Sequence, residues 1–280
     1  MPVLSPRRLG IVLVVISALV FSLAGVFTRG VSSAAWDIIF WRGLAAAGFT
    51  LAYLALRGHL RDEIRAFGKP ALLVAVLSAL GTSAFIPAFK LSSVANVALI
   101  YASAPFVAAF LAWVLVRELP KRRVMIAAGL AMGGVALIVG GTSGGAHIAG
   151  DALALVMTVM MAGVMVVYRC APATTAALPA AVSSLFLLPL GWYFGDPLAV
   201  PPGELPVLVL FGLVFAVASV TLSEGARRLP ASETALISTL EVPLAPTLAI
   251  LMLNEWPGVW AVVGGTLILG AVVWSQRPAP

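Results

Sequence analysis

The sequence contains few charged residues for its length. Aspartate, glutamate, lysine and arginine together make up 10% of its 280 residues, whereas about 25% is usual in soluble domains. Hydrophobic residues make up 61%, against roughly 45–50% in soluble domains. So few charges cannot cover the surface of a soluble protein of this size. The composition therefore predicts an integral membrane protein whose main surroundings are the lipid bilayer.

Cysteine and histidine are also scarce. Cys170 is the only cysteine, which excludes a disulfide scaffold. His59 and His147, the two histidines, have no metal-ligand spacing around them, so we expect no metal site. The 17 basic residues give a net charge of +6 but are spread along the chain, which argues against a nucleic-acid partner.

Motifs of common enzyme and ATP-binding sites are missing as well. The sequence contains no His-Glu-x-x-His motif, no phosphate-binding P-loop and no paired aspartates within its apolar runs. We therefore expect neither an enzyme nor a cofactor. Transport by such a chain is facilitated or coupled to an ion gradient rather than driven by ATP.

Long apolar runs are what the sequence has in abundance. A transmembrane helix needs about 20 apolar residues, and charges and Pro/Gly clusters divide the chain into ten continuous runs of about that length. The sequence therefore predicts an all-α integral membrane protein with ten transmembrane helices. The predicted spans are residues 9–28, 34–56, 71–89, 94–116, 124–140, 149–168, 176–194, 205–223, 232–253 and 258–275. The first run exceeds the 7–15-residue core of a signal peptide, so we expect it to be retained.

The distribution of basic residues predicts the orientation of these helices. Cytoplasmic loops carry an excess of lysine and arginine. With the N-terminus inside, only Arg29 and Lys90 fall in outer segments, and only Arg42 falls within a span. All the other lysines and arginines fall on the inner side, so we expect both termini in the cytoplasm.

The two halves of the sequence resemble each other. An offset of 138 residues places Pro105 on Pro243, and one residue of slippage then places Glu118 on Glu255, each at the end of its span. We expect the two glutamates to have a solvated or capping role.

Each half, residues 1–145 and residues 146–280, contains five predicted helices. Because five is odd, the second half starts on the opposite side of the membrane, which predicts two inverted repeats in one transport domain. Such symmetry is typical of alternating access, although duplicated bundles also form channels and scaffolds.

A proline in the fourth span, a glutamate at its end and a glycine-rich fifth span, all repeated in the second half, resemble the drug/metabolite transporter superfamily. The pattern is most similar to its ten-helix EamA-type branch. This resemblance implies efflux of amino acids or other small metabolites across a bacterial inner membrane. Within the branch, the chain resembles aromatic amino acid exporters of the YddG type. The small residues before Pro105 suit a broader range of neutral amino acids.

Glu241 lies near the centre of the ninth span, two residues before Pro243. A buried acid at mid-membrane costs about 2.5–3.5 kcal/mol on insertion scales, so it needs a partner, a proton or a water-filled cavity. We expect Glu241 to bind a substrate ammonium group or to carry a coupling proton. The alternative is a neutral, hydrogen-bonded structural glutamate.

Arg42 lies about two turns into the second span, with Trp41 beside it. Its guanidinium group is expected to meet a substrate carboxylate, to pair with Asp37 or to snorkel outward. Trp41 is either a neighbour of the substrate or an interfacial anchor.

Prolines near the middle of the fourth and ninth spans predict broken helices. Pro105 and Pro243 each remove a hydrogen bond to the carbonyl four residues earlier, on Tyr101 and Thr239. Free carbonyls at mid-membrane in both halves indicate a transporter's binding site, and the alternative is a simple proline kink. Further candidates are Tyr101, Ser103, Thr239, Thr82 and Ser83 as substrate contacts, with Pro87 and Pro246 as additional helix breaks.

Together these features predict an alternating-access exporter of neutral, aromatic or hydrophobic amino acids, with its site at mid-membrane between the repeats. Other metabolites or cationic drugs are the alternative substrates, and a channel or an intramembrane enzyme are the alternative classes. Glycines in the fifth and tenth spans predict close helix packing, within a monomer or at a homodimer interface.

Overall fold

The computed structural model describes residues 5–117, 119–142, 144–229 and 231–276, and their regular structure is helical throughout. The predicted all-α class is confirmed for these residues. The helices are α1 (Pro6–Ser22), α2 (Ala24–Arg29), α3 (Ala35–Leu56), α4 (Leu60–Ala66), α5 (Lys69–Leu91), α6 (Val94–Tyr101), α7 (Ala104–Val116), α8 (Arg122–Gly141), α9 (Gly145–Cys170), α10 (Ala177–Phe194), the 3₁₀ turn η1 (Pro197–Ala199), α11 (Leu205–Ala226), α12 (Ala231–Ser238), α13 (Glu241–Leu253) and α14 (Val259–Gln276).

Eight helical stretches in this part of the chain are long and apolar enough to cross a membrane, with α1 and α2 counted as one stretch and α6 and α7 as another. Glu241–Leu253 and Val259–Ser275 are shorter apolar helices. The protein is therefore a multi-pass membrane protein, and the count of ten spans stays a prediction.

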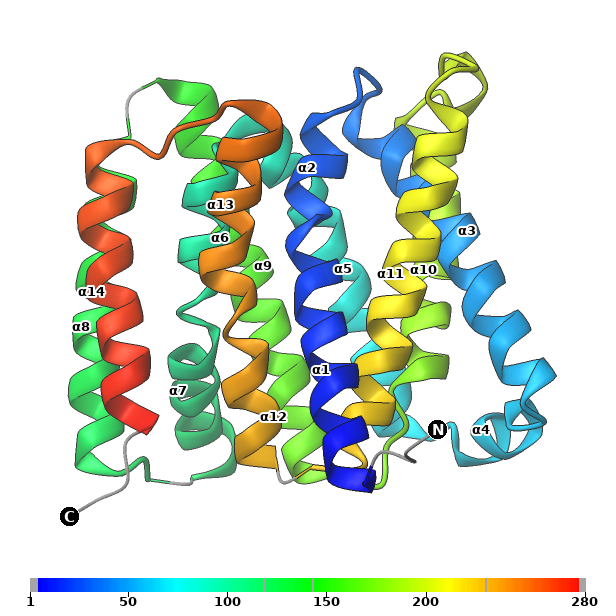
Figure 1. Cartoon of the computed structure of the whole chain (residues 1–280), viewed down its shortest axis with the longest axis horizontal. Helices are drawn as coiled ribbons and strands as arrows, with labels where there is room; N and C mark the ends of the chain where they lie inside the picture. Colours follow the sequence, from blue (N-terminus) through cyan, green and yellow to red (C-terminus); the bar gives the residue numbers. More distant parts are fainter. Residues whose placement is uncertain (1–4, 118, 143, 230, 277–280) are drawn as a thin grey trace.

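The helices stand side by side in an upright bundle (Figure 1). Helix α1 begins and helix α14 ends at the same end of the molecule, and the short helix α4 lies at that end too (Figure 1). We call it the N-terminal end. The opposite end holds α2 and the end of α13 (Figure 1).

The most extensive helix contacts join one half of the chain to the other. Helix α8 packs on α14, α3 on α10, and α6 on α13. Helix α5 packs on α9, and its expected counterpart α11 packs on α1. If each helix is replaced by its expected counterpart in the other half, the first three pairs map onto themselves, and the pair α5–α9 maps onto the pair α11–α1.

The first predicted span is not one helix, because it is interrupted at Leu23. The backbone N–H of Leu23 bonds to Val20 O instead of continuing the α-helical pattern. One residue earlier, the Ser22 hydroxyl donates to Ala18 O at 2.6 Å. Such back-bonding to the preceding turn can bend helices, but Thr158 makes the same bond within the unbroken α9, so this bond alone does not explain the break.

The helices around two of the predicted prolines are broken. Helix α6 ends at Tyr101, four residues before Pro105, and α12 ends at Ser238, five residues before Pro243. Both helices resume within three residues, as α7 and α13. A missing N–H and the clash of the proline ring with the preceding turn favour a break at this position.

The other two prolines do not break their helices, contrary to prediction. Helix α5 continues through Pro87 and α13 continues through Pro246. A proline removes one backbone hydrogen bond, and neighbouring helices in a bundle can support the turn around it.

Glycines allow α8 and α14 to approach closely. A side chain at Gly134 would meet Gly264 O at 2.6 Å, and one at Gly264 would meet Gly134 O. This glycine contact lies within one chain. Gly129, also on α8, has open space around it.

A carboxylate joins two loops at the end opposite the N-terminal end. Glu204, next to the first residue of α11, accepts hydrogen bonds from Ser32 N at 2.8 Å and Ser33 N at 3.0 Å, and from both serine hydroxyls. These bonds, first that of the Ser33 hydroxyl, lower the pKa of Glu204 from 4.5 to about 2. The charged form is therefore favoured in the folded protein.

Glu204 should make the stability of the protein pH-dependent. Because its folded-state pKa is depressed, its contribution is complete above about pH 4.5 and is lost as the pH falls towards about 2. Since the group is only partly buried, we expect a contribution of roughly 1 kcal/mol, or about 2–4 °C in the denaturation midpoint. Midpoints of the wild type and Glu204→Gln should differ at pH 7 and converge at acid pH. A constant difference would contradict this assignment.

Candidate functional site

A small cavity lies at the interrupted parts of the bundle. Residues from α1, α2, α5, α6, α9 and α13 surround it. They are Phe21, Ser22, Ala24, Gly25, Phe85, Phe89, Val97, Ala98, Tyr101, Met157, Glu241, Val242 and Ala245. Phe85 packs against two separate clusters of buried apolar residues, so the cavity lies where these clusters meet. We call it the central cavity.

Two of the predicted candidates, Tyr101 and Glu241, line the central cavity together. Tyr101 is the last residue of α6 and Glu241 is the first residue of α13. The two helix breaks therefore bring a phenol and a carboxyl group to one space. Within the described residues, no lysine or arginine lies within ion-pair distance of the Glu241 carboxyl group.

Aromatic rings form much of the remaining wall. Phe85 and Phe89 of α5 meet edge to face, with 4.8 Å between ring centroids. Phe21 lines the cavity from α1. An acid among aromatic and aliphatic walls suits a ligand with one cationic group and an apolar body.

The central cavity is nearly closed in this structure. Its volume is about 20 Å³, and on the same measure one water molecule needs roughly 10–15 Å³. A hydrogen bond and an ion pair of Glu255 join the loop after α13 to α6 and α2. Glu255 accepts a hydrogen bond from Val94 N at 2.6 Å and lies 3.4 Å from Arg29 Nε.

The Glu255 contact fits the capping role expected for this glutamate, because Val94 is the first residue of α6. The predicted repeat counterpart of Glu255 is Glu118, which lies outside the described residues.

Arg42 is buried beside the central cavity rather than in its wall. Its Cζ lies 4.2 Å from the ring centroid of Phe215 and 5.0 Å from that of Phe211. Within the described chain, its Nε has no hydrogen-bond partner. Phe215 in turn meets the cavity-lining Phe21 edge to face at 5.7 Å. Two rings thus separate a buried cation from the central cavity.

The expected alternatives for Arg42 and Trp41 have different outcomes. Asp37 does not pair with Arg42, because it accepts a hydrogen bond from Asp196 N at 2.7 Å. Arg42 does not snorkel outward either, since only 4% of its surface is exposed. Trp41 Nε1 donates to Pro197 O at 2.9 Å and so anchors the loop that contains η1.

Comparison with known proteins assigns the chain to a family. The sequence profile of the EamA-like transporter family matches residues 8–140 and again residues 148–276. The chain belongs to the EamA-like transporter family. The expected resemblance to the drug/metabolite transporter superfamily is thus confirmed at the family level.

Two further proteins are similar over most of this EamA-like transporter. An uncharacterized transporter of Bacillus subtilis (strain 168), YwfM, is 26% identical over 221 residues, which are 74% of this chain and 75% of YwfM. The superposition on a solved crystal structure covers 96% of this chain and 97% of the other chain, with a TM-score of 0.65 and 16% sequence identity. At that identity it shows a shared fold alone.

These relatives point to a transporter rather than an enzyme. They do not support the narrower resemblance to aromatic amino acid exporters of the YddG type.

Four predicted polar contacts of the EamA-like transporter do not line the central cavity. Ser103 is buried and its hydroxyl donates to Ile100 O at 2.7 Å. Ser83 donates to Leu80 O at 2.8 Å. Thr82 lies three residues before the lining residue Phe85, and Thr239 lies in the turn between α12 and α13, two residues before Glu241.

Most of the cavity wall consists of residues that the sequence did not single out. Phe21, Phe85, Phe89 and Met157 are apolar residues within apolar spans, so composition does not distinguish them from residues that face lipid. Ser22 carried a weak signal, as a hydroxyl at mid-span. Its Oγ lies 3.5 Å from Glu241 O, which brings the break in the first helix next to α13.

Proposed function

We propose that this EamA-like transporter is an alternating-access exporter of neutral amino acids with apolar or aromatic side chains. The substrate binds in the central cavity at mid-membrane, between the two halves of the chain. The observation that carries this proposal is the pairing of Tyr101 and Glu241, which the breaks of α6 and α12–α13 bring to one space.

Several features support two inverted repeats as the basis of alternating access. The family profile matches two successive stretches of nearly equal length. The helix pairings are unchanged when the halves are exchanged. Arg117 and Asn254, which directly follow α7 and α13, are the two non-glycine residues with a left-handed backbone within the described chain. They are separated by the same offset as Glu118 and Glu255.

A carboxyl group in the cavity wall and a buried cation behind that wall favour a zwitterionic substrate. Glu241 offers a carboxylate for the substrate's ammonium group. Arg42 holds a buried guanidinium that is without a carboxylate partner among the described residues. An unpaired buried charge is costly, and the two phenylalanine rings offset only part of that cost. In this proposal, Phe215 moves aside and Arg42 meets the substrate's carboxylate.

The proposed setting is the bacterial cytoplasmic membrane, with the N-terminal end of the bundle facing the cytoplasm. Most of the lysines and arginines of the loops fall on the side of that end, as the preference of cytoplasmic loops for basic residues requires. Glu241 serves as the ammonium site or as the site of a coupling proton.

Exchange in liposomes tests the proposed substrate class. Purified protein should exchange labelled phenylalanine, methionine and threonine with saturation, and phenylalanine should compete with methionine. If none of the three shows saturable exchange, the amino acid proposal fails. Large, non-saturating conductance would instead indicate a channel.

Cationic drugs are the second candidate substrates, because the central cavity combines a carboxyl group with aromatic walls. A labelled aromatic cation without a carboxylate belongs in the same liposome panel. Exchange of that cation without exchange of any amino acid would favour this second candidate.

A further inference from the structure

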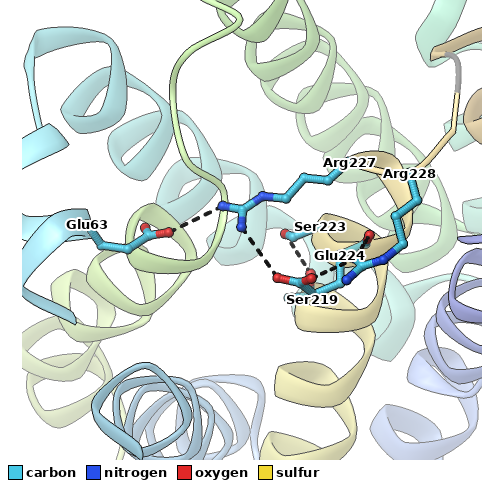
Figure 2. A network of polar contacts seen from close by, with 6 residues as sticks. All are labelled: Glu63, Ser219, Ser223, Glu224, Arg227 and Arg228. Carbon is cyan, nitrogen blue, oxygen red and sulfur yellow. Dashed lines mark hydrogen bonds and ion pairs between the residues drawn. The ribbon is translucent and has the colours of Figure 1, made fainter. Parts of the chain in front are cut away.

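A second cavity lies at the N-terminal end of the bundle, between α3, α4, the start of α10 and the end of α11. Its volume is about 220 Å³, which is far more than the central cavity offers. Figure 2 shows part of its polar lining, where Glu63 of α4 faces Arg227 and Glu224 near the end of α11. We call it the terminal cavity.

The carboxylates of the terminal cavity differ in how well they are satisfied. Glu224 accepts from Arg228 at 2.7 Å and from Arg227 at 3.4 Å (Figure 2). Glu63 is only 6% exposed, yet its single ionic contact among the described residues is Arg227 at 3.7 Å, which is longer than a hydrogen bond. Within the described residues, Glu63 Oε2 has no hydrogen-bond partner.

A hydroxyl group in the terminal cavity also lacks a hydrogen-bond partner. Thr175 Oγ1 lines the same cavity, is buried, and has no hydrogen-bond partner within the described chain. Buried polar atoms without partners are rare, and each calls for a ligand or solvent contact. A buried carboxylate oxygen and a hydroxyl together provide acceptors for an ammonium group, which has three donors.

The terminal cavity also holds a cation that a zwitterion would use. The Arg227 side chain is 57% exposed and its contact with Glu63 is long. An ammonium group on Glu63 would release Arg227 Nη2 to meet a carboxylate, while Nη1 keeps its contact with Glu224. No described group of histidine, cysteine and acidic residues in the chain could hold a metal ion, so the acceptors suit an organic ammonium group better than a metal.

We propose that the terminal cavity is a second amino acid site, in which Glu63 and Thr175 bind the ammonium group of the transported amino acid outside the central cavity. This inference rests on the proposed function for the identity of the ligand. The site gives the amino acid a place at the N-terminal end of the pathway while the central cavity is closed.

Cysteine protection tests the site without measuring transport. Ala66 is exposed and lines the terminal cavity, so Ala66→Cys places a reporter there. Cys170 is exposed and is first replaced by serine. The rate of modification by a methanethiosulfonate reagent is then measured in the purified full chain, with phenylalanine, phenethylamine or 3-phenylpropionate present.

Phenylalanine and phenethylamine, which carry an ammonium group, should slow modification. At a ligand concentration ten times the Kd, we expect about tenfold protection, because that is the ratio of total to free sites. The acid 3-phenylpropionate should give none. Equal protection by the acid, or no protection by either amine, would overturn the proposal. Protection by phenethylamine alone would overturn the assignment to an amino acid.

Variants of two acidic residues test whether the protection depends on Glu63. Glu63→Gln should abolish protection, and Thr175→Val should weaken it. Glu233→Gln removes an acid at the same end that pairs with Arg7 at 3.0 Å outside the cavity, and it should leave protection unchanged. If Glu63 only holds α4 against α11, ligands with and without an ammonium group will protect equally. This comparison applies to every variant that folds.

Glu241→Gln separates this proposal from the proposed function. Protection of the reporter should survive that change, because Glu241 lines the other cavity; its loss would show that the ligand acts from the central cavity. Protection without exchange in liposomes would leave the terminal site standing and the transport proposal failed. Exchange without protection would support the transport proposal and overturn the terminal site.

Discussion

Replacement of Glu241 by glutamine is expected to lower the saturable exchange of phenylalanine by at least about tenfold. The substitution keeps the shape of the side chain and removes the ionisable carboxyl group that lines the central cavity. A hydrogen bond to a charged group contributes about 1.5–3 kcal/mol, which corresponds to roughly 10- to 150-fold in affinity. Initial rates in liposomes at several substrate concentrations provide the measurement.

The same variant distinguishes the two roles proposed for Glu241. If the carboxyl group carries a coupling proton, an imposed pH gradient alters wild-type exchange and leaves Glu241→Gln unaffected. If it binds only the ammonium group, the gradient has the same relative effect on both. Exchange by Glu241→Gln within twofold of wild type, together with an unchanged response to the pH gradient, would rule out both roles.

Arg42→Met is the matched test of the other charge. It keeps an unbranched side chain between Phe211 and Phe215, and replacement of a buried charge by an apolar group is often neutral for folding. Loss of exchange with normal folding would support a contact with the substrate's carboxylate. Unchanged exchange would make Arg42 a structural contact of the two rings.

Replacement of Gly134 by valine is expected to have the largest effect on folding. The first added carbon would lie 2.6 Å from the backbone oxygen of Gly264. Backbone cannot turn away as a flexible side chain can, so α8 and α14 must separate. Overpacking costs about 1–3 kcal/mol and sometimes more, and at this size each kcal/mol lowers the denaturation midpoint by roughly 2–4 °C.

Gly129 provides the control on the same helix. Nothing lies within 4 Å of a side chain added there, so Gly129→Val should shift the midpoint by no more than about 2 °C, since surface substitutions usually stay within about 0.5 kcal/mol. Size-exclusion elution after heating, in one detergent for all variants, provides the midpoints. Equal shifts for the two variants would show that the contact of α8 with α14 does not carry the effect.

The sequence predicted the helices better than the site. Membrane thickness sets the length of an apolar span, and charged loops mark its ends, so the helix bounds agree with the predicted spans to within about four residues. The breaks near Pro105 and Pro243 were predictable for a local reason, since proline removes a donor. The break at Leu23 carries no such mark, because the predicted span around it contains no proline.

The walls of the central cavity could not be predicted in the same way. Phe85 and Phe89 face the cavity because α5 packs against α9 and α2 on particular sides, and a uniformly apolar helix shows no periodicity to reveal those sides. Arg42 illustrates the same limit. Its partners, Phe211 and Phe215, lie in the other half of the chain, so only the assembled bundle shows that Asp37 is not its counterion.

The break at Leu23 also bears on the energy of the transport cycle. In an exchanger built from the two proposed repeats, the end states open to either side would be mirror images of equal free energy if the halves were identical. Helix α9, the counterpart of α1 and α2, runs unbroken from Gly145 to Cys170. In the proposed cycle, that difference would make the free energies of the two end states unequal, so the empty transporter would populate them unequally. Such a bias would belong to the chain itself and would exist before any substrate or ion gradient is applied.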